Sequence, residues 1–486
     1  MNEPVVQQRR TKIVATMGPA SSTPEALRSM LKAGVDVIRL NLSHGTVEDH
    51  LARLALVRST ADELRKVVAI LADLPGPKIR AGAFPVDGVV LREGSTVAFV
   101  TGKTASTAER IEVEYPTLID DLGPGDRIVV GDGAISARII EVSGLAATAV
   151  IVTGGRVAGR PGVHLPSTRT RLVTPTPRDL ELAVTMAGAG VDFLAVSFVS
   201  EGSDMREVRN AVSSLPKPPR LIAKIETAQA MENLADILRE SDAIMVARGD
   251  LGIDCDLADV PHIQKRLIRT CVEEGIPVIT ATQMLETMVT APTPTRAEVS
   301  DVANAVFDGT DAVMLSAETA VGRDPSLVVR TMSEICMRAE AQASYRQWAN
   351  RLGRMQRASQ TTDRSLRITE ALTHAAWQAA EDARADAIVC CTRSGATARA
   401  MARFRPLARL IAASPSLASV RVLALSWGVI PIRIDEQKTA DDMIWVAVEQ
   451  ATKLGLVSAG ELVVALAGTR HELGSPIDLA RIIEIH

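Results

Sequence analysis

The sequence predicts an α/β protein: a (β/α)8 TIM barrel with an inserted small β-barrel lid domain and a C-terminal α/β domain. Three observations predict this fold. Short apolar runs alternate with amphipathic helical patterns, one long insert of different character interrupts them, and a second alternating pattern follows a polar stretch. Continuously apolar runs of about four to eight residues are typical of strands that are buried on both faces of a parallel sheet.

Eight apolar runs are the predicted barrel strands. Several follow a polar turn, such as Gly34-Val35-Asp36 and Gly190-Val191-Asp192, as expected where a helix leads into a strand of a β/α unit. The eight runs are Lys12–Ala15, Val35–Leu42, Val67–Leu71, Val191–Val196, Leu221–Ile225, Ala243–Val246, Pro277–Thr280 and Ala312–Leu315.

Helical patterns lie between these runs. The first follows Ser22-Thr23, residue types that favour a helix N-terminus, and opens on a proline. Strands that alternate with helices fit a closed barrel, although an open doubly wound sheet has the same alternation. The predicted helices are Pro24–Ala33, Asp49–Arg65, Asp179–Ala187, Ser203–Ser213, Ala228–Arg239, Pro261–Glu274 and Arg296–Asp308.

A long insert separates the third run from the fourth. Its short alternating stretches Val97–Val100, Arg127–Val130 and Ala137–Val142 indicate strands, and glycine-rich turns lie between them. The insert is therefore expected to be all-β. Because the loops that follow barrel strands lie on the carboxyl face, where active sites are built, we expect it to act as a lid.

The chain becomes polar after about residue 345, where Arg351–Arg367 indicates a linker or connecting helix. A smaller α/β pattern follows, with strands at Ala387–Cys391, Leu410–Ala413 and Leu462–Ala467 and helices at Thr369–Arg384, Thr397–Phe404 and Ala440–Leu454. The predicted domains are residues 1–73 and 170–345 for the catalytic barrel, 74–169 for the lid, and 346–486 for a C-terminal domain with a regulatory or oligomerisation role.

Composition excludes several classes of protein. A net charge of −4 offers no field to attract nucleic acid or anionic membrane, and four Trp, two Tyr and six Phe are few for stacking on bases. The five Cys lack zinc-site spacing and are odd in number, which argues against a disulfide framework. The polar N-terminus MNEPVVQQRRTK contains no apolar signal core, and no run is long enough to span a membrane. We expect a cytoplasmic protein that binds neither nucleic acid nor membrane.

Polar side chains end the apolar runs on one side. Because the carboxyl ends of parallel barrel strands meet on one face, these side chains are expected to converge. They are Arg39, Asn41, Ser43 and His44 after the second run; Asp73, Lys78 and Arg80 after the third; Ser197 after the fourth; then Lys224 and Glu226, Arg248 and Asp250, Thr282 and Gln283, and Ser316 and Glu318.

Cations and carboxylates in this set point to phosphoryl transfer. Arg39, Arg80 and Lys224 suit a phosphate group, and two carboxylates with open positions, Glu226 and Asp250, suit Mg²⁺. Neutralising charge and positioning substrates accomplish most of the catalysis in this chemistry. Lys224 and Glu226 could instead form a simple salt bridge, because residues two apart in a strand share a face. No P-loop or dinucleotide fingerprint is present, so a nucleotide would bind in another way.

Seven ordered segments resemble the pyruvate kinase family, and the insert and C-terminal domain fall where that family has them. The resemblance implies transfer of the phosphoryl group of phosphoenolpyruvate to ADP, giving pyruvate and ATP, the final step of glycolysis. The segments are TKIVATMGPASS (Thr11–Ser22), DVIRLNLSHG (Asp36–Gly45), AKIE (Ala223–Glu226), SDAIMVARGDLG (Ser241–Gly252), PVITATQMLE (Pro277–Glu286), PTRA (Pro294–Ala297) and SDVANAVFDGTDAVMLSAE (Ser300–Glu318).

The resemblance also implies a role for each matching residue. Glu226 and Asp250 would bind Mg²⁺, or Mn²⁺ in its place, and Lys224 would stabilise the transferring phosphoryl group and the enolate. Arg39 would contact the substrate phosphate and the nucleotide. The turn Ala247–Asp250, including Gly249, would bind the substrate carboxylate through backbone N–H groups.

The remaining roles concern the proton and the nucleotide. Thr282 would contact the substrate near the carbon that is protonated, and Ser316 would belong to the proton relay. Asn41, His44 and Arg80 would contact ADP or ATP.

Two departures from the family pattern bear on ion and nucleotide binding. Relatives that depend on K⁺ carry a glutamate where this chain has Lys78, beside a monovalent-cation site that would use Asn41, Ser43, Asp73 and the carbonyl of Leu74. We expect the Lys78 ammonium to replace K⁺, so that K⁺ is not required. Ser200-Glu201 stands where many relatives have a basic pair, which removes one expected nucleotide contact.

The C-terminal domain contains a candidate effector loop. Thr392, Arg393, Ser394, Gly395 and Thr397 follow a strand and open a helix, an arrangement that can bind anions, although an ordinary capped turn has the same pattern. Relatives bind phosphorylated effectors in a similar loop, so the resemblance implies allosteric regulation by a phosphorylated effector. It also implies a homotetramer.

Two alternatives to a pyruvate kinase stay open from the sequence. A Mg²⁺-dependent lyase or aldolase acting on a pyruvate enolate would share the lysine and the two carboxylates but would need neither a lid nor a nucleotide site. A binding regulator that had lost catalysis is disfavoured because Lys224, Glu226, Asp250 and Thr282 are all present.

Overall fold

The computed structural model of the chain describes residues 9–131, 133, 135–167, 170–358, 363–468 and 477–486. Two predicted segments lie partly outside the described residues. One is the polar N-terminal segment, from which a cytoplasmic location was expected, and the other is the predicted 351–367 linker.

Eight parallel strands close into a barrel in the order β1-β16-β15-β14-β13-β12-β3-β2. This closure confirms the (β/α)8 prediction over the open doubly wound sheet. Most of these strands are buried at every position, as their uninterrupted apolar runs predicted. Their bounds are β1 (Lys12–Thr16), β2 (Val37–Asn41), β3 (Ala69–Asp73), β12 (Phe193–Val196), β13 (Arg220–Ile225), β14 (Ala243–Ala247), β15 (Val278–Ala281) and β16 (Ala312–Leu315).

Helices surround the barrel, and threonines cap several of them. The hydroxyls of Thr23, Thr46, Thr176 and Thr295 each accept a hydrogen bond from a backbone N–H in the first turn of their helix. The helices are α1 (Pro24–Ala33), α2 (Val47–Glu63), α3 (Pro177–Gly188), α4 (Gly202–Val212), α5 (Ala228–Glu232), α6 (Leu234–Glu240), α7 (Arg248–Asp254), α8 (Val260–Glu274), α9 (Arg296–Asp308), α10 (Ala317–Ala320) and α11 (Pro325–Gln342).

Two helices differ from the sequence prediction. The predicted helix 228–239 divides at Asn233, which ends α5 and starts α6. Helix α7 forms where the sequence indicated only a turn at a helix start, and it does so although its two glycines each disfavour a helix by about 1 kcal/mol. The observed helix matters for function, since it carries Asp250.

The insert contains a six-stranded sheet in the order β11-β7-β8-β9-β5-β6 and a two-stranded sheet of β10 and β4. Isolated bridges from Arg80 to Gly162 and from Ala81 to Val113 place residues 80–81 between the two edges of the larger sheet. The sheet of the insert is therefore nearly closed into a small barrel of its own. The strands are β4 (Phe84–Leu91), β5 (Thr96–Thr101), β6 (Arg110–Val113), β7 (Arg127–Val130), β8 (Ile135–Ser143), β9 (Ala146–Thr153), β10 (Gly155–Gly159) and β11 (Val163–His164).

The C-terminal segment forms a five-stranded sheet in the order β19-β18-β17-β20-β21 with helices around it. Helix α12 is the connecting helix that was anticipated within the polar stretch. The elements are α12 (Tyr345–Ala358), α13 (Arg364–Ala383), β17 (Ala387–Cys391), α14 (Ala396–Ala402), β18 (Arg409–Ser414), α15 (Leu417–Val422), β19 (Val429–Arg433), α16 (Ala440–Lys453), β20 (Leu462–Ala467) and β21 (Leu479–Glu484).

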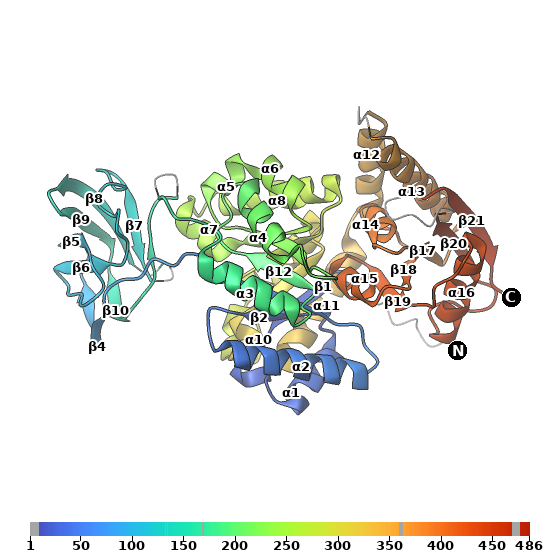
Figure 1. The fold of residues 1–486 in the computed structure, drawn as a ribbon, viewed down its shortest axis with the longest axis horizontal. Helices are drawn as coiled ribbons and strands as arrows, with labels where there is room; N and C mark the ends of the chain where they lie inside the picture. Colours follow the sequence, from blue (N-terminus) through green and yellow to red (C-terminus); the bar gives the residue numbers. More distant parts are fainter. Residues whose placement is uncertain (1–8, 132, 134, 168–169, 359–362, 469–476) are drawn as a thin grey trace.

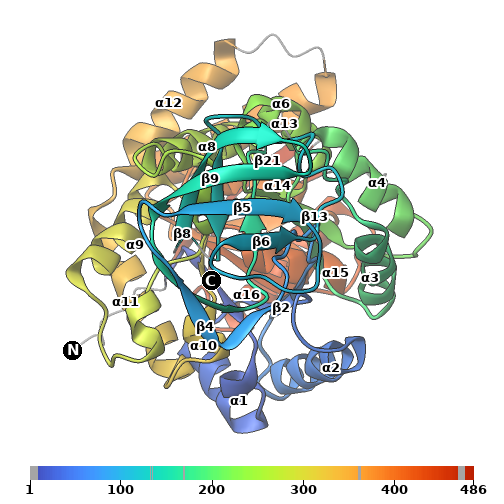
Figure 2. The same cartoon turned by 90° about the vertical axis from the view of Figure 1, so that its left-hand side faces the viewer.

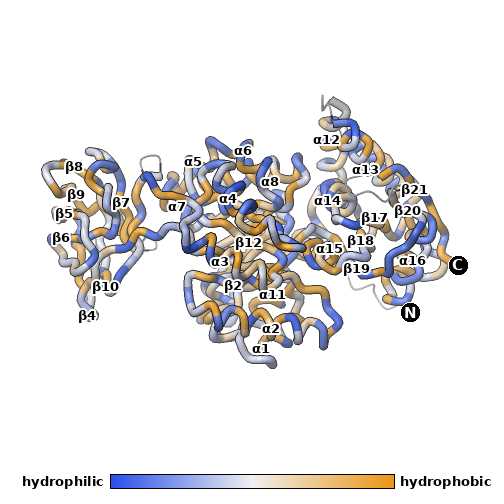
Figure 3. Tube along the Cα trace, viewed as in Figure 1, coloured by the Kyte–Doolittle hydropathy of each residue, from blue (hydrophilic) through white to orange (hydrophobic). Residues whose placement is uncertain are grey.

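The three parts lie in a row, with the barrel in the middle (Figure 1). The insert leaves the barrel after the carboxyl end of β3 and returns before α3, and its sheet faces the viewer in front of the barrel in Figure 2. Outer helices such as α2 and α3 mix hydrophobic and hydrophilic residues along their length, as expected of helices with one face against a core (Figure 3). No helix among the described residues is long and apolar enough to cross a membrane.

A buried arginine attaches the C-terminal domain to the amino end of the barrel. Arg405, 3% exposed, donates to the Asp311 carboxylate (3.0 Å) and to the carbonyl of Gly309 (2.6 Å), just before β16. Its guanidinium lies 4.9 Å from the ring centroid of Trp427. The carboxyl end of the barrel thus stays available for the insert.

We expect Arg405→Ala to lower the free energy of unfolding by about 3–5 kcal/mol, because the variant leaves Asp311 buried with its arginine missing. Urea denaturation followed by circular dichroism measures the change. Arg409→Ala is the matched control: Arg409 pairs with Glu461 at a partly exposed site, and its loss should cost about 1 kcal/mol or less. Equal losses in the two variants would contradict the assignment.

Candidate active site

The predicted site residues lie at the carboxyl ends of the barrel strands. Strand β2 carries Arg39 and Asn41, and β3 ends at Asp73. Lys224 lies in β13 and Glu226 directly follows it, while β14 runs into α7 with Gly249 and Asp250. Thr282 follows β15 and Ser316 follows β16. The closed parallel sheet brings these strand ends to one face.

A buried ionic cluster forms the floor of the site. Lys224 Nζ lies 2.8 Å from Glu226 Oε1 and 3.4 Å from Asp73 Oδ1, and it donates to Ser197 Oγ at 2.7 Å. Arg39 Nε lies 2.7 Å from the other Asp73 oxygen. Asp73 therefore joins the two cations. The Lys224–Glu226 salt bridge, which the sequence left open as an alternative to a functional role, is also present in the cluster.

Mutual interactions set the charges in this cluster. Burial opposes the charge of Lys224, but the carboxylates of Asp73, Glu226 and Asp250 outweigh it and raise the pKa of Lys224. Burial also opposes ionisation of Asp73, yet Lys224 and Arg39 hold the pKa of Asp73 below its usual range. Burial, together with the nearby charge of Asp250, raises the pKa of Glu226 to about 7 despite Lys224.

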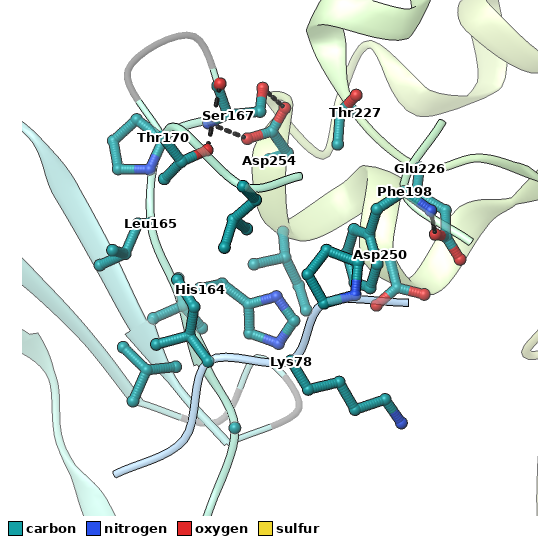
Figure 4. A pocket seen from close by; sticks show the side chains of 18 of the residues that line it. Lys78, His164, Leu165, Ser167, Thr170, Phe198, Glu226, Thr227, Asp250 and Asp254 are labelled. Atoms are coloured by element: carbon teal, nitrogen blue, oxygen red, sulfur yellow. Dashed lines mark hydrogen bonds between the residues drawn. The ribbon is translucent and has the colours of Figure 1, made fainter. Parts of the chain in front are cut away.

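Two carboxylates face the cleft between barrel and insert, a cavity of about 780 Å³ that both Glu226 and Asp250 line. Figure 4 shows their side chains beside each other. The described residues contain no group of three or more His, Cys, Asp or Glu that could hold a metal ion. The pair fits Mg²⁺, which takes one or two protein carboxylates and completes its shell with water and substrate oxygens.

Lys78 reaches the region predicted for a monovalent cation. Its Nζ donates to Ser43 Oγ at 2.9 Å, and the Ser43 N–H in turn donates to Asn41 Oδ1 at 3.2 Å. Burial and the neighbouring Lys224 and Arg80 lower the pKa of Lys78, against the attraction of Asp73 and Asp250.

Thr282 adopts a strained backbone conformation. Its φ of 67° is unfavourable for a β-branched residue. Thr282 Oγ1 accepts a hydrogen bond from the Gly249 N–H (2.9 Å), and the Arg248 guanidinium donates to the Thr282 carbonyl (2.6 Å) and to Asp301 (2.7 Å). Arg248 thus braces Thr282, and the Gly249 N–H, expected to meet the substrate carboxylate, is hydrogen bonded to Thr282 in this structure.

Ser316 has a buried hydroxyl with no hydrogen-bond partner among the residues that the structure describes. Its backbone N–H donates to Glu318 Oε2 at 2.6 Å, and Glu318 Oε1 accepts from the N–H of Leu285 after β15. The hydroxyl is thus held in place while remaining open to a new hydrogen bond, as a proton relay requires.

The predicted nucleotide residues lie along the cleft in part. His44 and Arg80 line it together with Lys78, and Arg80 Nη1 donates to the Arg160 carbonyl at 3.1 Å. Asn41 is not among the residues lining the cleft and bonds Ser43 instead. Ser200, the first residue of the altered pair, also lines the cleft, and its N–H and hydroxyl both donate to Asp204.

The candidate effector loop lies outside the cleft, between β17 and α14. Thr392 Oγ1 accepts from the Gly395 N–H at 3.0 Å, and Ser394 Oγ accepts from the Ala396 N–H at 3.4 Å. Arg393 pairs with Glu436 at 2.7 Å, and Thr397 is buried. The turn is thus internally hydrogen bonded.

Ser197 and Thr16 contact the cluster but were given no role from the sequence. Ser197 accepts from Lys224 and donates to the Leu74 carbonyl (2.8 Å), while Thr16 Oγ1 accepts from Arg39 at 3.1 Å. Each ends or follows an apolar barrel run, the same signal that identified Asp73 and Glu226. A serine or threonine at a strand end carries no charge, so the sequence indicates a role in the site less clearly for these residues than for Asp73 and Glu226.

A closed barrel that gathers cations and paired carboxylates at its carboxyl face defines an enzyme of the barrel class that acts on anionic substrates with a divalent metal. The family model described as the pyruvate kinase barrel domain matches residues 8–329, and that of the pyruvate kinase alpha/beta domain matches residues 370–483. The chain belongs to the pyruvate kinase family.

Individual relatives agree. The chain is 42% identical over 464 residues to a pyruvate kinase of Geobacillus stearothermophilus, covering 95% of this chain and 78% of that protein. It is 38% identical over 476 residues to a pyruvate kinase of Methylorubrum extorquens, covering 98% and 97%. It is also 38% identical over 478 residues to pyruvate kinase 2 of Synechocystis, covering 98% of this chain and 79% of that protein.

These matches confirm the family, fold class and phosphotransferase activity predicted from the sequence, over the lyase alternative. They also support use of a divalent metal ion, which is general in the family.

Ser197→Ala should reduce kcat for pyruvate formation by about tenfold, because the Lys224 ammonium loses one of its hydrogen-bond partners and its fixed orientation. Steady-state kinetics at saturating phosphoenolpyruvate and ADP measure this change. Ser203→Ala removes a hydroxyl that bonds Glu201 away from the cluster and should leave kcat unchanged. An unaltered kcat in Ser197→Ala would show that this hydroxyl does not position Lys224.

Proposed function

We propose that this chain transfers the phosphoryl group of phosphoenolpyruvate to ADP in a Mg²⁺-dependent reaction, giving pyruvate and ATP. The observation that carries the proposal is the buried Lys224–Asp73–Arg39 cluster beside Glu226 and Asp250, beneath a cleft that the insert helps to form. Mn²⁺ is the alternative ion for the same two carboxylates.

Lys224 and Arg39 bind and neutralise the transferring phosphoryl group. Both are held by Asp73 at the end of β3, so their charges are already positioned before substrate arrives. Preorganised charge of this kind stabilises a transition state without reorganisation at the moment of reaction. Glu226 and Asp250 would hold the metal ion, which would supply neutralisation of the charge on the substrate oxygens.

Protonation of the enolate carbon completes the reaction. We assign Thr282 to the substrate contact near this carbon and Ser316 to the relay that delivers the proton. The unpartnered Ser316 hydroxyl supports its assignment, as does the brace that holds Thr282 in its strained conformation. Backbone N–H groups in the first turn of α7, at Gly249 and Asp250, bind the substrate carboxylate. The Gly249 N–H, which donates to Thr282 Oγ1 in this structure, exchanges that bond for the substrate.

The nucleotide lies in the cleft between barrel and insert, where His44 and Arg80 contact it. Asn41, at the end of β2, bonds Ser43 and does not line the cleft in this structure, so its contact with the nucleotide requires it to turn toward the cleft. The insert, residues 74–169, excludes water from the cleft and so limits hydrolysis of the transferring group. With Ser200 and Glu201 at the start of α4 in place of a basic pair, nucleotide phosphates rely more on Arg39, Arg80 and the metal ion.

The Lys78 ammonium replaces a monovalent cation. It lies at the Ser43 hydroxyl and is attracted by the Asp73 carboxylate, two groups proposed to hold the ion together with Asn41 and the Leu74 carbonyl. A fixed positive charge at this point performs the electrostatic role of K⁺.

Further proposals concern the rest of the molecule. The division into a barrel of residues 1–73 and 170–345, an insert and a domain of residues 346–486 follows the change of sheet along the chain. We propose a phosphorylated effector at Thr392–Thr397, supported by the position of this turn between β17 and α14. A homotetramer and a cytoplasmic location remain proposals that rest on the resemblance and the composition.

Purified protein should form pyruvate from phosphoenolpyruvate only when both ADP and Mg²⁺ are present. Coupled oxidation of NADH by lactate dehydrogenase measures pyruvate, with one substrate omitted at a time. Turnover without ADP would favour the lyase, and no turnover under any condition would favour a binding regulator.

Lys78→Glu should convert a K⁺-independent enzyme into one that K⁺ activates by about tenfold or more. The substitution removes the resident cation and adds a carboxylate beside Asp73, so an external cation is needed to balance the charge. Initial rates with K⁺ salts are compared with rates in tetramethylammonium salts. Lys103→Glu, an exposed lysine of the insert, makes the same charge change elsewhere and should behave as the original chain. Strong K⁺ activation of the unsubstituted protein would refute the proposal.

A further inference from the structure

We propose that Asp254 is a positioning residue that docks the insert onto the barrel next to the two metal-binding carboxylates. Its partner in the insert is Ser167, close to the point where the insert returns to the barrel. The mechanism described above uses neither residue.

The Asp254 carboxylate accepts three hydrogen bonds from two different segments. Its Oδ1 accepts from the Ser167 N–H at 3.0 Å, and its Oδ2 accepts from the Ser167 hydroxyl at 2.6 Å and from the Ala228 N–H at 2.7 Å. Figure 4 shows the two contacts with Ser167. One side chain thus joins the insert, helix α7 and the start of α5.

These segments carry both proposed metal ligands. Asp254 is the last residue of α7 and stands four positions after Asp250, so the two carboxylates lie on the same face of that helix, and both line the cleft. Ala228 stands two positions after Glu226 and is the first residue of α5. Movement of the insert at Ser167 is therefore transmitted to the backbone on either side of the metal site.

The location of Asp254 is unfavourable for α7 by itself. A carboxylate at the carboxyl end of a helix meets the negative end of the helix dipole and gains no stability there. Its three donors all lie outside α7, so the stabilisation that Asp254 provides goes to contacts between segments. This pattern is expected of a residue that fixes the geometry between segments.

A second contact reaches the same turn of α7. Arg127 Nη1 from β7 of the insert lies 3.5 Å from the Ile253 carbonyl. Thr170 Oγ1 also donates to the Ser167 carbonyl at 3.2 Å. Two parts of the insert therefore meet the barrel at the final turn of α7.

A hydrogen bond that forms only when the insert is docked favours the closed arrangement before substrate binds. If a smaller fraction of the enzyme is in the closed arrangement, the apparent affinity for substrate falls in proportion. Saturating substrate returns the enzyme to the closed arrangement. Loss of the Ser167 hydroxyl should therefore raise KM and change kcat little. A purely structural role would lower the amount of active enzyme instead.

The experiment compares Ser167→Ala, Ser167→Thr and Ser95→Ala in the full chain. Ser95 is a serine of the insert whose hydroxyl donates to the Arg92 carbonyl within its own turn. We expect Ser167→Ala to raise KM for both substrates by about five- to tenfold, the change that follows from losing one hydrogen bond of typical net strength while the Ser167 N–H still bonds Asp254. Its kcat should stay within about twofold, Ser167→Thr should restore KM, and Ser95→Ala should match the original chain.

Hydrogen–deuterium exchange provides a readout that does not depend on activity. Amides of residues 228–232 and 249–255 should exchange faster in Ser167→Ala than in Ser95→Ala, with Ser167→Thr at the original rate. Unchanged exchange in these peptides, or a KM that Ser167→Thr does not restore, would overturn the docking role.

The kinetic part rests on the proposed function, whereas the exchange part does not. A chain that forms no pyruvate would refute the proposed function and leave the exchange experiment to decide the role of Asp254. Asp254→Asn gives an independent check. The asparagine amide has only one acceptor oxygen, so its NH2 group would face Ser167 or Ala228, which both donate hydrogen bonds to Asp254. It should raise exchange at least as much as Ser167→Ala, and unchanged exchange would again overturn the proposal.

Discussion

The buried carboxylate of Asp73 is the interaction on which the rest of the site depends. At the end of β3 it binds Arg39 from the neighbouring strand through one oxygen and Lys224 from β13 through the other. Two cations in a water-poor barrel mouth would otherwise repel each other and attract solvent. Asp73 between them holds the two cations close together at the carboxyl end of the barrel. Asp73 is also the last residue of β3, where the chain leaves the barrel to form the insert. The charge cluster therefore lies directly beside the start of the insert.

The two ends of the barrel have separate tasks. The amino end receives the C-terminal domain through Arg405, Asp311 and Trp427, an interface of buried charge and aromatic packing. The carboxyl end presents Lys78, Glu226 and Asp250 to a large cleft that residues of the insert also line. Each barrel strand thus runs from the interface with the C-terminal domain to the end that carries the site residues.

The sequence was most informative where one physical cause dominated. The barrel strands are buried on both faces, so continuous apolar runs located all eight, and charged groups at their ends located Arg39, Lys224, Glu226 and Asp250. The sequence was less informative where tertiary contacts override local preference. Helix α7 forms despite two glycines because its side chains are held from other elements, and several strands of the insert lack strict alternation. The contact between Ser167 and Asp254 joins positions far apart in the chain, which no local pattern reveals.

Closure of the barrel has a consequence for how the chain acquires its structure during synthesis. Strand β1 pairs with β2 on one side and with β16 on the other, so the first barrel strand in the chain must wait for the last barrel strand before its second edge is covered. The insert, by contrast, pairs almost entirely with itself and can fold as soon as it emerges. Long-range pairing slows folding and exposes unpaired strand edges meanwhile. A compact β unit that forms between β3 and β12 shortens the effective distance between the two parts of the unfinished barrel.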